Sequence, residues 1–387
     1  MAAAWETDVL VVGAGPVGLL LAGDLRAGGA RVTVVERLAG PMTESRASTL
    51  HARTMELLDE RSVLDRLGAL PDGGPGHFGG IRLDLSEADP DHRFAGQWKC
   101  PQTTLESVLA SRAEALGVQV HRETRLTGLV QHGDRVVTEV TGPNGATGRV
   151  TAGWVAGCDG ERSTVRELAG FPFPGEDATR EMLRADVLGI TIPDRRFERL
   201  PAGLATAFRW PDGSTRVMVH LYGATPQARA GNPGFDEVVA AWAKVTGEDI
   251  GAGTPVWLNA FDNTSRQAGG YRQGRVLLAG DAAHRQMPVG GQALNLGLQD
   301  AAELSGPLLD RLRGGPHSVL DRYDARRRPV GARTLTNIQA QTLLLLGGPE
   351  IEGVREIFAE LMGFGAVRAH LARMISGIGP AGPAATS

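Results

Sequence analysis

The hydrophobic pattern at the start of the chain alternates between two periods. A short apolar run over 8–12 predicts a buried strand, and leucines at helical spacing predict a helix over 16–26. The β-branched segment 31–36 predicts a second strand. Because a strand, a helix and a strand within about 30 residues form a βαβ unit, this pattern predicts a parallel sheet.

Beyond residue 36, the predicted elements change twice in type, to short antiparallel strands and then back to a buried strand and helices. Helices are predicted over 48–67, 103–116, 235–244 and 292–312, with further helices up to 376, and strands over 118–120, 125–130, 135–140, 150–157 and 275–279. Thr103 or Thr104 is the expected cap of its helix. Segment 189–220 contains short strands broken by prolines, which is typical of an antiparallel meander. The pattern therefore predicts an α/β nucleotide-binding fold that is interrupted by an antiparallel layer.

Composition narrows the class of protein. The chain has 387 residues and a net charge of −4, so we expect two or three domains and no basic surface for nucleic acid. Cys100 and Cys158 lie far apart, which argues against a disulfide framework and against a zinc site. The apolar stretch 9–23 is too short to span a bilayer, and no basic residue precedes it as in a signal peptide. We therefore expect a cytoplasmic protein that binds neither membrane nor metal.

Glycines at 13, 15 and 18 match the G-x-G-x-x-G pattern of dinucleotide-binding proteins. Two further matches, 74–79 and 377–382, neither follow a predicted strand nor begin a helix. Gly13 would allow a sharp turn, Gly15 a close approach of a pyrophosphate, and Gly18 close packing of helix on sheet. Glu36 ends the second strand, where it could accept hydrogen bonds from a ribose. The alternative is a glycine turn in a sheet that binds no nucleotide, and the motif alone does not separate FAD from NAD.

Two aspartates follow predicted strands beside a glycine. Asp159 follows 150–157, and Asp281 follows 275–279. Such carboxylates can bind sugar or ribityl hydroxyls, although an Asx turn or a helix N-cap is the commoner use of aspartate at such places. Gly290 and Gly291 then precede a helix, whose N-terminus would suit a flat ring with partial negative charge, such as a reduced flavin.

Together these signals resemble the single-component FAD-dependent aromatic hydroxylases of the p-hydroxybenzoate hydroxylase fold. The segments that carry the resemblance are GAGPVG (13–18) with Glu36, SRA (45–47) with LHARTMELL (50–58), PQTTLE (101–106), CDG (158–160) with STVR (163–166), and GDAAH (280–284) with PVGGQALN (288–295) and QDA (299–301). Segments 76–80, 255–257 and 348–350 resemble the branch that acts on aromatic polyketides of the angucycline and anthracycline type, in antibiotic biosynthesis. Many such hydroxylases carry a C-terminal thioredoxin-like domain, which we expect this chain to lack.

The resemblance implies a role for each matching residue. Glu36 and Arg37 would bind the adenosine, Asp159 and Asp281 would bind phosphate and ribityl groups, and Cys158 would be structural. The expected FAD-binding residues are Gly13, Gly15, Pro16, Val17, Gly18, Glu36, Arg37, Arg46, Gln102, Leu126, Asp159, Asp281, Pro288, Gly290, Gly291, Leu294 and Asn295. Arg46 is also the expected catalytic residue, because it could stabilise an enolate or phenolate of the substrate.

The implied reaction uses FAD, NADPH or NADH, and O2. Hydride would reduce the flavin, O2 would form a C4a-hydroperoxide, and an electron-rich aromatic ring would take the distal oxygen. The candidates for a base that deprotonates a phenol are His51, His77, His220 and His284, although a lone histidine is more often structural. The expected substrate pocket contains His77, Phe78, Trp210, Met218, His220 and Tyr222. The alternative for the last four is a stripe of core residues.

These expectations define domains and competing functions. We expect an FAD-binding domain of 1–75, 101–180 and 262–312, a substrate domain of 76–100 and 181–261, a C-terminal helical segment of 313–376 and a flexible tail of 377–387. The arginines at 326–328 predict pairing at a helix end. The expected function is hydroxylation of a polycyclic aromatic polyketide, with a homodimer as the assembly. The alternatives are Baeyer–Villiger, dehydration or ring-opening chemistry on the same scaffold, and a non-catalytic flavin-binding protein.

Overall fold

The computed structural model describes residues 3–45, 47–210, 212–229 and 231–378. The chain begins with strand β1 (Ala3–Val12), helix α1 (Pro16–Ala27) and strand β2 (Val32–Val35), which confirms the predicted βαβ unit. The inner half of β1 and all of β2 are buried because the sheet is covered on both faces.

The larger sheet has the strand order β18-β19-β10-β1-β2-β7. Its additional members are β7 (Gln119–His121), β8 (Arg125–Gln131), β9 (Val136–Thr141), β10 (Thr147–Gly157), β18 (Arg272–Gln273) and β19 (Val276–Leu278). Strands β19, β10, β1, β2 and β7 pair in parallel, so their carboxyl ends share one edge. Strands β8 and β9 extend the other part of β10 as an antiparallel ribbon. This is the α/β layer with a parallel sheet that the sequence predicts.

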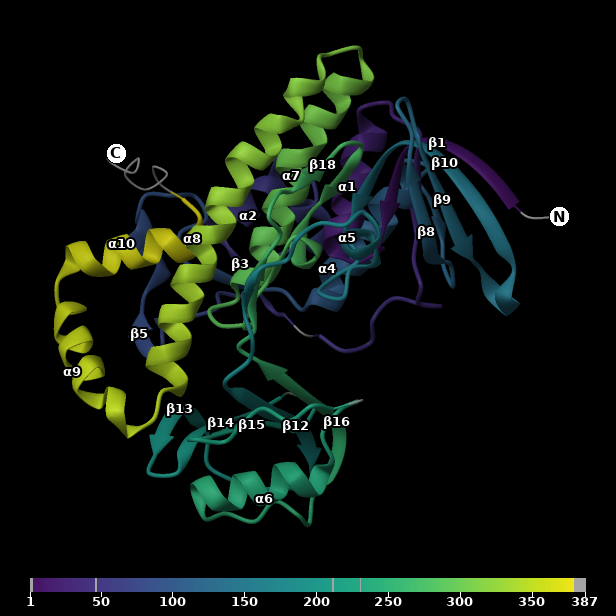
Figure 1. The fold of residues 1–387 in the computed structure, drawn as a ribbon. Coiled ribbons are helices and arrows are strands. Elements are labelled where there is room, and N and C mark those ends of the chain that lie inside the picture. Colours follow the sequence, from purple (N-terminus) through teal and green to yellow (C-terminus); the bar gives the residue numbers. More distant parts are fainter. Residues whose placement is uncertain (1–2, 46, 211, 230, 379–387) are drawn as a thin grey trace.

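A second sheet lies below the first in Figure 1, with antiparallel order β13-β14-β15-β12-β16. The strands are β12 (Glu181–Leu188), β13 (Arg195–Leu200), β14 (Gly203–Arg209), β15 (Thr215–Leu221) and β16 (Thr254–Asp262). Helix α6 (Phe235–Thr246) packs on one face through Val238 and Trp242, against Val217 and Val219 of β15. The opposite face is therefore directed at the rest of the molecule.

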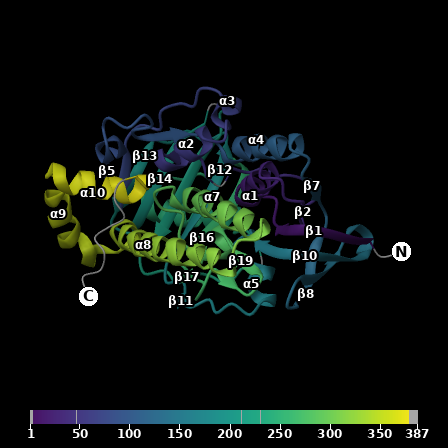
Figure 2. The same ribbon diagram turned by 90° about the horizontal axis from the view of Figure 1, so that it is seen from above.

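Long helices join the two sheets. Helix α7 (Gln292–Leu312) packs against α1, and α8 (Asp321–Leu346) runs beside α7, as Figures 1 and 2 show. The end of α8 contributes Ile338 and Leu345 to a cluster with Met287 and Val289, which precede α7, and with Met182 of the antiparallel sheet. Helices α9 (Glu352–Leu361) and α10 (Gly365–Ser376) close the described chain at one side of this cluster.

The remaining elements are short. They are β3 (Thr49–His51), α2 (Ala52–Asp59), α3 (Leu64–Leu67), β4 (Gly76–Phe78), β5 (Ile81–Leu83), β6 (Gln97–Lys99), α4 (Gln102–Ala115), α5 (Thr164–Leu168), β11 (Gly175–Glu176), β17 (Ser265–Gln267) and β20 (His284–Arg285), with 3-10 turns η1 (Leu85–Ala88), η2 (Pro143–Gly145), η3 (Gly280–Ala282), η4 (His317–Val319) and η5 (Pro349–Ile351). Strands β11, β17 and β20 form a small sheet, and β3 pairs with β6 and β4 with β5.

Two local expectations were wrong. The predicted helix 48–67 begins as strand β3, because Thr49–His51 pairs with Gln97–Lys99, and it is interrupted after α2, where Ser62 has φ 52°. The cap of α4 is Pro101, without a side-chain hydrogen bond, rather than Thr103 or Thr104. Both differences arise from contacts with segments that are distant in the sequence, which the local hydrophobic pattern cannot reveal.

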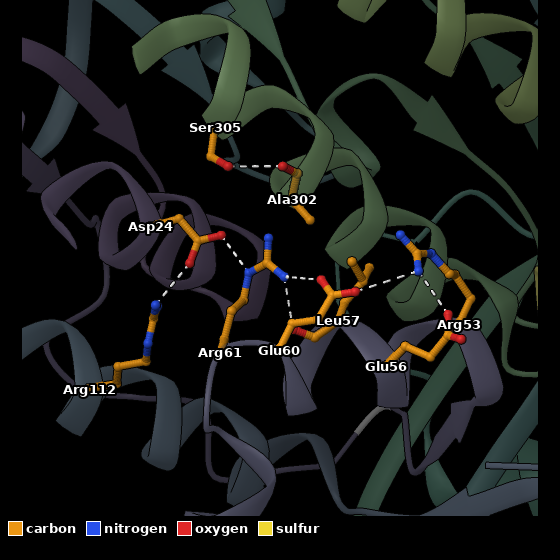
Figure 3. A network of polar contacts seen from close by, with 9 residues as sticks. All are labelled: Asp24, Arg53, Glu56, Leu57, Glu60, Arg61, Arg112, Ala302 and Ser305. Atoms are coloured by element: carbon orange, nitrogen blue, oxygen red, sulfur yellow. Dashed lines mark hydrogen bonds and ion pairs between the residues drawn. The ribbon is translucent and has the colours of Figure 1, made fainter. Parts of the chain in front are cut away.

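An ionic network ties α1, the turn after α2, and α4 together (Figure 3). The carboxylate of Asp24 on α1 accepts hydrogen bonds from Arg61 Nε at 2.6 Å and from Arg112 Nη2 at 2.9 Å. The Asp24 side chain is only 8% exposed, so water competes little with Arg61 and Arg112 for its carboxylate. Glu60 also pairs with Arg61, but from a largely exposed position.

Candidate functional site

The loops after β1 and β10 meet backbone to backbone at the carboxyl edge of the parallel sheet. A Cβ added to Gly13, whose φ is +105°, would lie 2.4 Å from the carbonyl oxygen of Cys158. A Cβ on Gly18 would lie 2.0 Å from the carbonyl oxygen of Gly13. Both positions therefore need glycine for packing, which explains two of the three glycines of the motif.

The third glycine is different, because it faces open space. No described atom lies within 4 Å of a Cβ built on Gly15. Gly15 is the N-cap of α1, and Pro16 follows at the first helical position. The first N–H groups of a helix lack partners within the helix, so α1 presents positive partial charge at this open corner. This is the local geometry that binds a pyrophosphate.

The turn after β19 joins the same corner. Gly280 has φ +63°, and its Cβ would lie 3.1 Å from the side chain of Val17 on α1. A Cβ on Gly297 of α7 would lie 2.8 Å from Val17 and 3.1 Å from the Cα of Gly280. Close packing of these three segments brings Asp281, which is exposed in turn η3, next to the N-terminal half of α1.

Glu36 lies at the end of β2, beside the glycine loop. Its carboxylate accepts hydrogen bonds from the backbone N–H of Ala14 and of Leu38, both at 2.8 Å. A carboxylate has further lone pairs for ribose hydroxyls, so these bonds orient it without saturating it. Arg37 lines a surface hollow of about 440 Å³ together with Leu38, Ala39, Glu123, Arg125, Thr141, Gly142 and Pro143. Leu126, whose side chain is buried, follows Arg125 on β8.

Asp159 is engaged locally. Its carboxylate accepts hydrogen bonds from Ser163 Oγ at 2.5 Å and from the N–H of Val165 at 3.1 Å, at the start of α5. Burial raises the pKa of this carboxyl group. These contacts are of the local capping kind that the sequence leaves open as an alternative. Burial also raises the pKa of the Cys158 thiol, which disfavours its reactive thiolate form.

The glycines before α7 form a tight turn at its N-terminus. Gly290 and Gly291 have φ +66° and +67°, a conformation that favours glycine. Asn295 holds this turn against β3: its side chain donates to the carbonyls of Thr49 and Gly291 and accepts from the N–H of His51. Asn295 therefore acts through the turn, while the exposed Pro288 and the half-buried Leu294 flank it.

The segment at 45–47 contacts the start of α4. The N–H of Gln102 donates to Ser45 Oγ at 3.0 Å and to the carbonyl of Ala47 at 2.8 Å. Arg46, the expected catalytic residue, lies outside the described residues.

These residues fit an FAD molecule. The N-termini of α1 and α7 open on the same side of the sheet, the space at Gly15 has no side chain in it, and Glu36 has acceptor capacity for a ribose. A comparison with protein families agrees: residues 6–338 match the model of the FAD binding domain. The chain belongs to this family.

Several relatives of this chain are named as monooxygenases. The flavoprotein is 41% identical to 12-dehydrotetracycline 5-monooxygenase/anhydrotetracycline 6-monooxygenase of Streptomyces rimosus, over 96% of this chain and 76% of that protein. It is 36% identical to dialkyldecalin synthase of Streptomyces rugosporus, over 96% and 80% of the two chains. The crystal structure of CabE, an aromatic hydroxylase from angucycline biosynthesis, superposes with a TM-score of 0.92 at 44% identity, over 96% and 76%.

These findings confirm the expected fold and cofactor. The flavoprotein is an FAD-dependent aromatic hydroxylase of the p-hydroxybenzoate hydroxylase fold, with NAD(P)H as electron donor and O2 as oxidant. None of the helices in the described parts of the chain combines the length and hydrophobicity that crossing a bilayer requires. The same described residues contain no group of three His, Cys, Asp or Glu side chains arranged for a metal ion.

The expected pocket residues of the antiparallel sheet are only partly brought together. Met218 and His220 share the face of β15 that is directed away from α6. Both ring nitrogens of His220 face backbone carbonyls, Glu181 at 2.7 Å and Leu346 at 3.1 Å, and burial lowers its pKa. Tyr222 follows the strand, with its ring 5.8 Å from that of His220, and Trp210 precedes β15 against Phe208. The geometry of His220 fits a structural role better than that of a base.

His77 and Phe78 lie on β4, at the α9 side. The His77 ring packs on Phe197 at 4.4 Å, and burial lowers its pKa to about 4. Phe78 is buried against Phe358 of α9. The structure therefore places Phe78 in the core between β4 and α9, apart from the face that carries Met218.

Sequence reasoning missed an aromatic and cationic layer on that face. Arg184 of β12 stacks on Trp257 at 4.2 Å and on Phe261 at 5.3 Å, both from β16, and its Nη2 donates to Asn259. Arg216 lies 5.2 Å from the same Trp257 ring. The signal was present in the alternate positions of Trp257, Asn259 and Phe261 along one strand.

Proposed function

We propose that the flavoprotein hydroxylates a polycyclic aromatic polyketide that lies between the antiparallel sheet and the N-terminus of α7. The observation that carries this proposal is the layer formed by Arg184, Trp257 and Phe261. It stacks one guanidinium group on two aromatic rings, and it belongs to the face opposite α6. Fused aromatic rings with phenol and carbonyl groups can stack on such a layer and donate or accept hydrogen bonds at its edge.

The same face is joined to the expected flavin loop. Met182 and Phe261 of the sheet lie in one apolar cluster with Met287 and Val289, which immediately precede Gly290 and Gly291. A ring bound on this face is therefore close to the turn at which α7 begins. FAD, when bound, supplies the activated oxygen; the chain binds the aromatic ring, orients it and excludes water.

The named activities of the relatives support an aromatic polyketide. One relative is named as a monooxygenase of 12-dehydrotetracycline and anhydrotetracycline, and CabE is named as an aromatic hydroxylase from angucycline biosynthesis. The first experiment supplies the purified holoprotein with NADPH and a panel of hydroxynaphthacenequinones and angucyclinones, and records oxygen uptake and product mass. We expect substrate-stimulated oxygen uptake and a product that gains one oxygen with its rings intact.

A matched pair of variants tests where the substrate binds. Trp257→Leu removes an aromatic plane from the proposed substrate face, whereas Leu258→Ala changes the next residue of β16, which packs on the α6 side. We expect Trp257→Leu to raise the KM for the aromatic substrate at least fivefold and Leu258→Ala to leave that KM within twofold. Equal KM values for Trp257→Leu and the wild type would contradict the assignment of this face.

A second function has one observation in its favour. The relative named dialkyldecalin synthase shows that this scaffold also occurs in a protein whose name does not denote an oxygenase. A product of unchanged mass, or one that has lost water, would favour such chemistry over hydroxylation. A lactone that has gained one oxygen would favour Baeyer–Villiger insertion. A flavoprotein that shows no turnover with any member of the panel would favour the non-catalytic alternative.

We also propose the division of the chain by role. Segments 1–75, 101–180 and 262–312 would bind FAD, and 76–100 and 181–261 would bind substrate, supported by the separate cores of the parallel and antiparallel sheets. Segment 313–376 would brace both, since α8 reaches the cluster between them. Sedimentation equilibrium and cell fractionation would test the proposed homodimer and the cytoplasmic location.

A further inference from the structure

A charged cluster is buried directly behind the turn that carries Asp281. The carboxylate of Asp300, in the middle of α7, is fully buried, and so is His284 of β20. Asp300 Oδ2 accepts a hydrogen bond from His284 Nε2 at 2.7 Å, and its Oδ1 accepts one from Arg327 Nε of α8 at 2.7 Å. Because a carboxylate only accepts, the hydrogen of His284 lies on Nε2.

The third donor to Asp300 is the turn itself. The backbone N–H of Gly280 donates to Asp300 Oδ2 at 3.1 Å. Arg327 additionally donates to the carbonyl of Leu296 on α7 at 3.3 Å. One carboxylate therefore fixes the strand-end turn, β20 and α8 relative to α7, whose N-terminus faces the expected flavin ring.

We propose that Asp300, with His284 and Arg327, is a positioning residue for FAD. It sets the position of Asp281 relative to the N-terminus of α7, so that both engage one cofactor. The turn cannot shift toward α1 or α7, because Val17 and Gly297 pack on Gly280. The Gly280 N–H bond then fixes the remaining freedom of the turn.

The charges explain why the cluster persists in the core. The Arg327 guanidinium and the His284 ring hold the pKa of the Asp300 carboxyl below its ordinary value, although burial alone would raise it. Asp300 also keeps the pKa of Arg327 raised. An asparagine at 300 would accept with one oxygen only and would leave Arg327 without its counter-charge. The three side chains therefore depend on one another, and Asp300 and His284 can be tested by separate substitutions.

The experiment compares the FAD dissociation constants of the wild type, Asp300→Asn and His284→Gln, measured by flavin fluorescence, with the visible spectrum of the bound flavin as a second signal. Tyr323→Phe is the matched control. Tyr323 is also buried, and its hydroxyl donates to the carbonyl of Leu278 at 2.7 Å, close to the same turn but without a hydrogen bond to Asp300. We expect Asp300→Asn to raise the FAD dissociation constant at least tenfold and His284→Gln at least threefold, with an altered flavin spectrum.

The control separates positioning from simple loss of stability. Tyr323→Phe should lower the thermal stability of the apoprotein and leave FAD affinity within twofold of the wild type. If His284→Gln and Asp300→Asn lose stability like Tyr323→Phe but bind FAD with wild-type affinity and spectrum, the proposal is wrong. Should Asp300→Asn fail to fold, His284→Gln alone decides by the same criterion. The inference rests on FAD binding, so failure of the wild type to bind FAD would overturn the proposed function instead.

Discussion

Gly15 and Gly18 belong to one motif, but the structure predicts opposite consequences for adding a methyl group to each. The Cβ of Gly15→Ala would meet no described atom within 4 Å, and the backbone at Gly15, with φ −76° and ψ 179°, suits alanine. The Cβ of Gly18→Ala would lie 2.0 Å from the carbonyl oxygen of Gly13. Gly15→Ala should therefore weaken only the binding of FAD, and Gly18→Ala should lower the stability of the protein itself.

The magnitudes follow from these contacts. Gly15→Ala should change the free energy of unfolding of the apoprotein by no more than about 0.5 kcal/mol. Gly18→Ala forces α1 away from the loop, and overpacking of this kind costs about 2 kcal/mol, more than the roughly 1 kcal/mol that alanine gains in a helix. For FAD, a methyl group at position 15 displaces the pyrophosphate from the helix N-terminus, and we expect at least a tenfold loss, about 1.4 kcal/mol.

The assay is urea unfolding of each apoprotein, repeated with FAD at 100 times the wild-type dissociation constant. FAD should stabilise the wild type by about 2.7 kcal/mol and Gly15→Ala by about 1.4 kcal/mol or less. Wild-type FAD affinity in Gly15→Ala would refute the placement of the pyrophosphate at this corner. Wild-type stability of Gly18→Ala would refute the packing argument.

Two further predictions concern stability. Asp24→Asn breaks the buried ionic contacts with Arg61 and Arg112, so it should lower the free energy of unfolding, measured by urea denaturation, by about 2 kcal/mol. The exposed control Glu60→Gln should lower it by less than about 0.5 kcal/mol. Equal losses in the two variants would contradict the argument from burial. Burial lowers the pKa of His51 to about 4, so the unfolded chain takes up a proton below about pH 6.5 that the folded chain refuses, and stability falls as the pH drops from 6.5 toward 4. Denaturation at pH 7 and pH 5 should show that His51→Gln loses about 2 kcal/mol less than the wild type between these pH values, and an identical loss would show that His51 is not buried in its neutral form.

The fold was predictable where sequence and structure share a local period. The glycine motif, the two strands around it and the parallel sheet follow from apolar runs and from the spacing of Gly13, Gly15 and Gly18. Strand β3 was not predictable in the same way, because Thr49–His51 pairs with Gln97–Lys99, which lie almost 50 positions further along the chain. Pairings of this kind depend on the whole fold, so a helical pattern in 48–67 was misleading at its start.

The candidate site shows the same division. The motifs predict close backbone packing at Gly13 and Gly280, and the structure shows it. This packing was predictable because a glycine in the sequence directly marks a position without a side chain. The arginines at 326–328 were expected to pair at a helix end, yet Arg327 is buried well inside α8 and pairs with Asp300. No local pattern contains this pair, because its partners meet only when α7 and α8 pack together. The alternation of Trp257, Asn259 and Phe261 in β16 is visible in the sequence, but the stacking of two of these rings on Arg184 of β12 is not.

The reaction that we propose for this FAD-dependent enzyme inserts one atom of dioxygen into a C–H bond of a polycyclic aromatic ring held on the antiparallel sheet. Turnover of the holoprotein with NADPH and an angucyclinone or naphthacenequinone under isotopically labelled dioxygen, followed by mass spectrometry of the product, tests it most directly. We expect a product with one labelled oxygen on an intact ring system, formed in proportion to the NADPH consumed. A product without label, or NADPH oxidation that no aromatic compound of the panel stimulates, would contradict it.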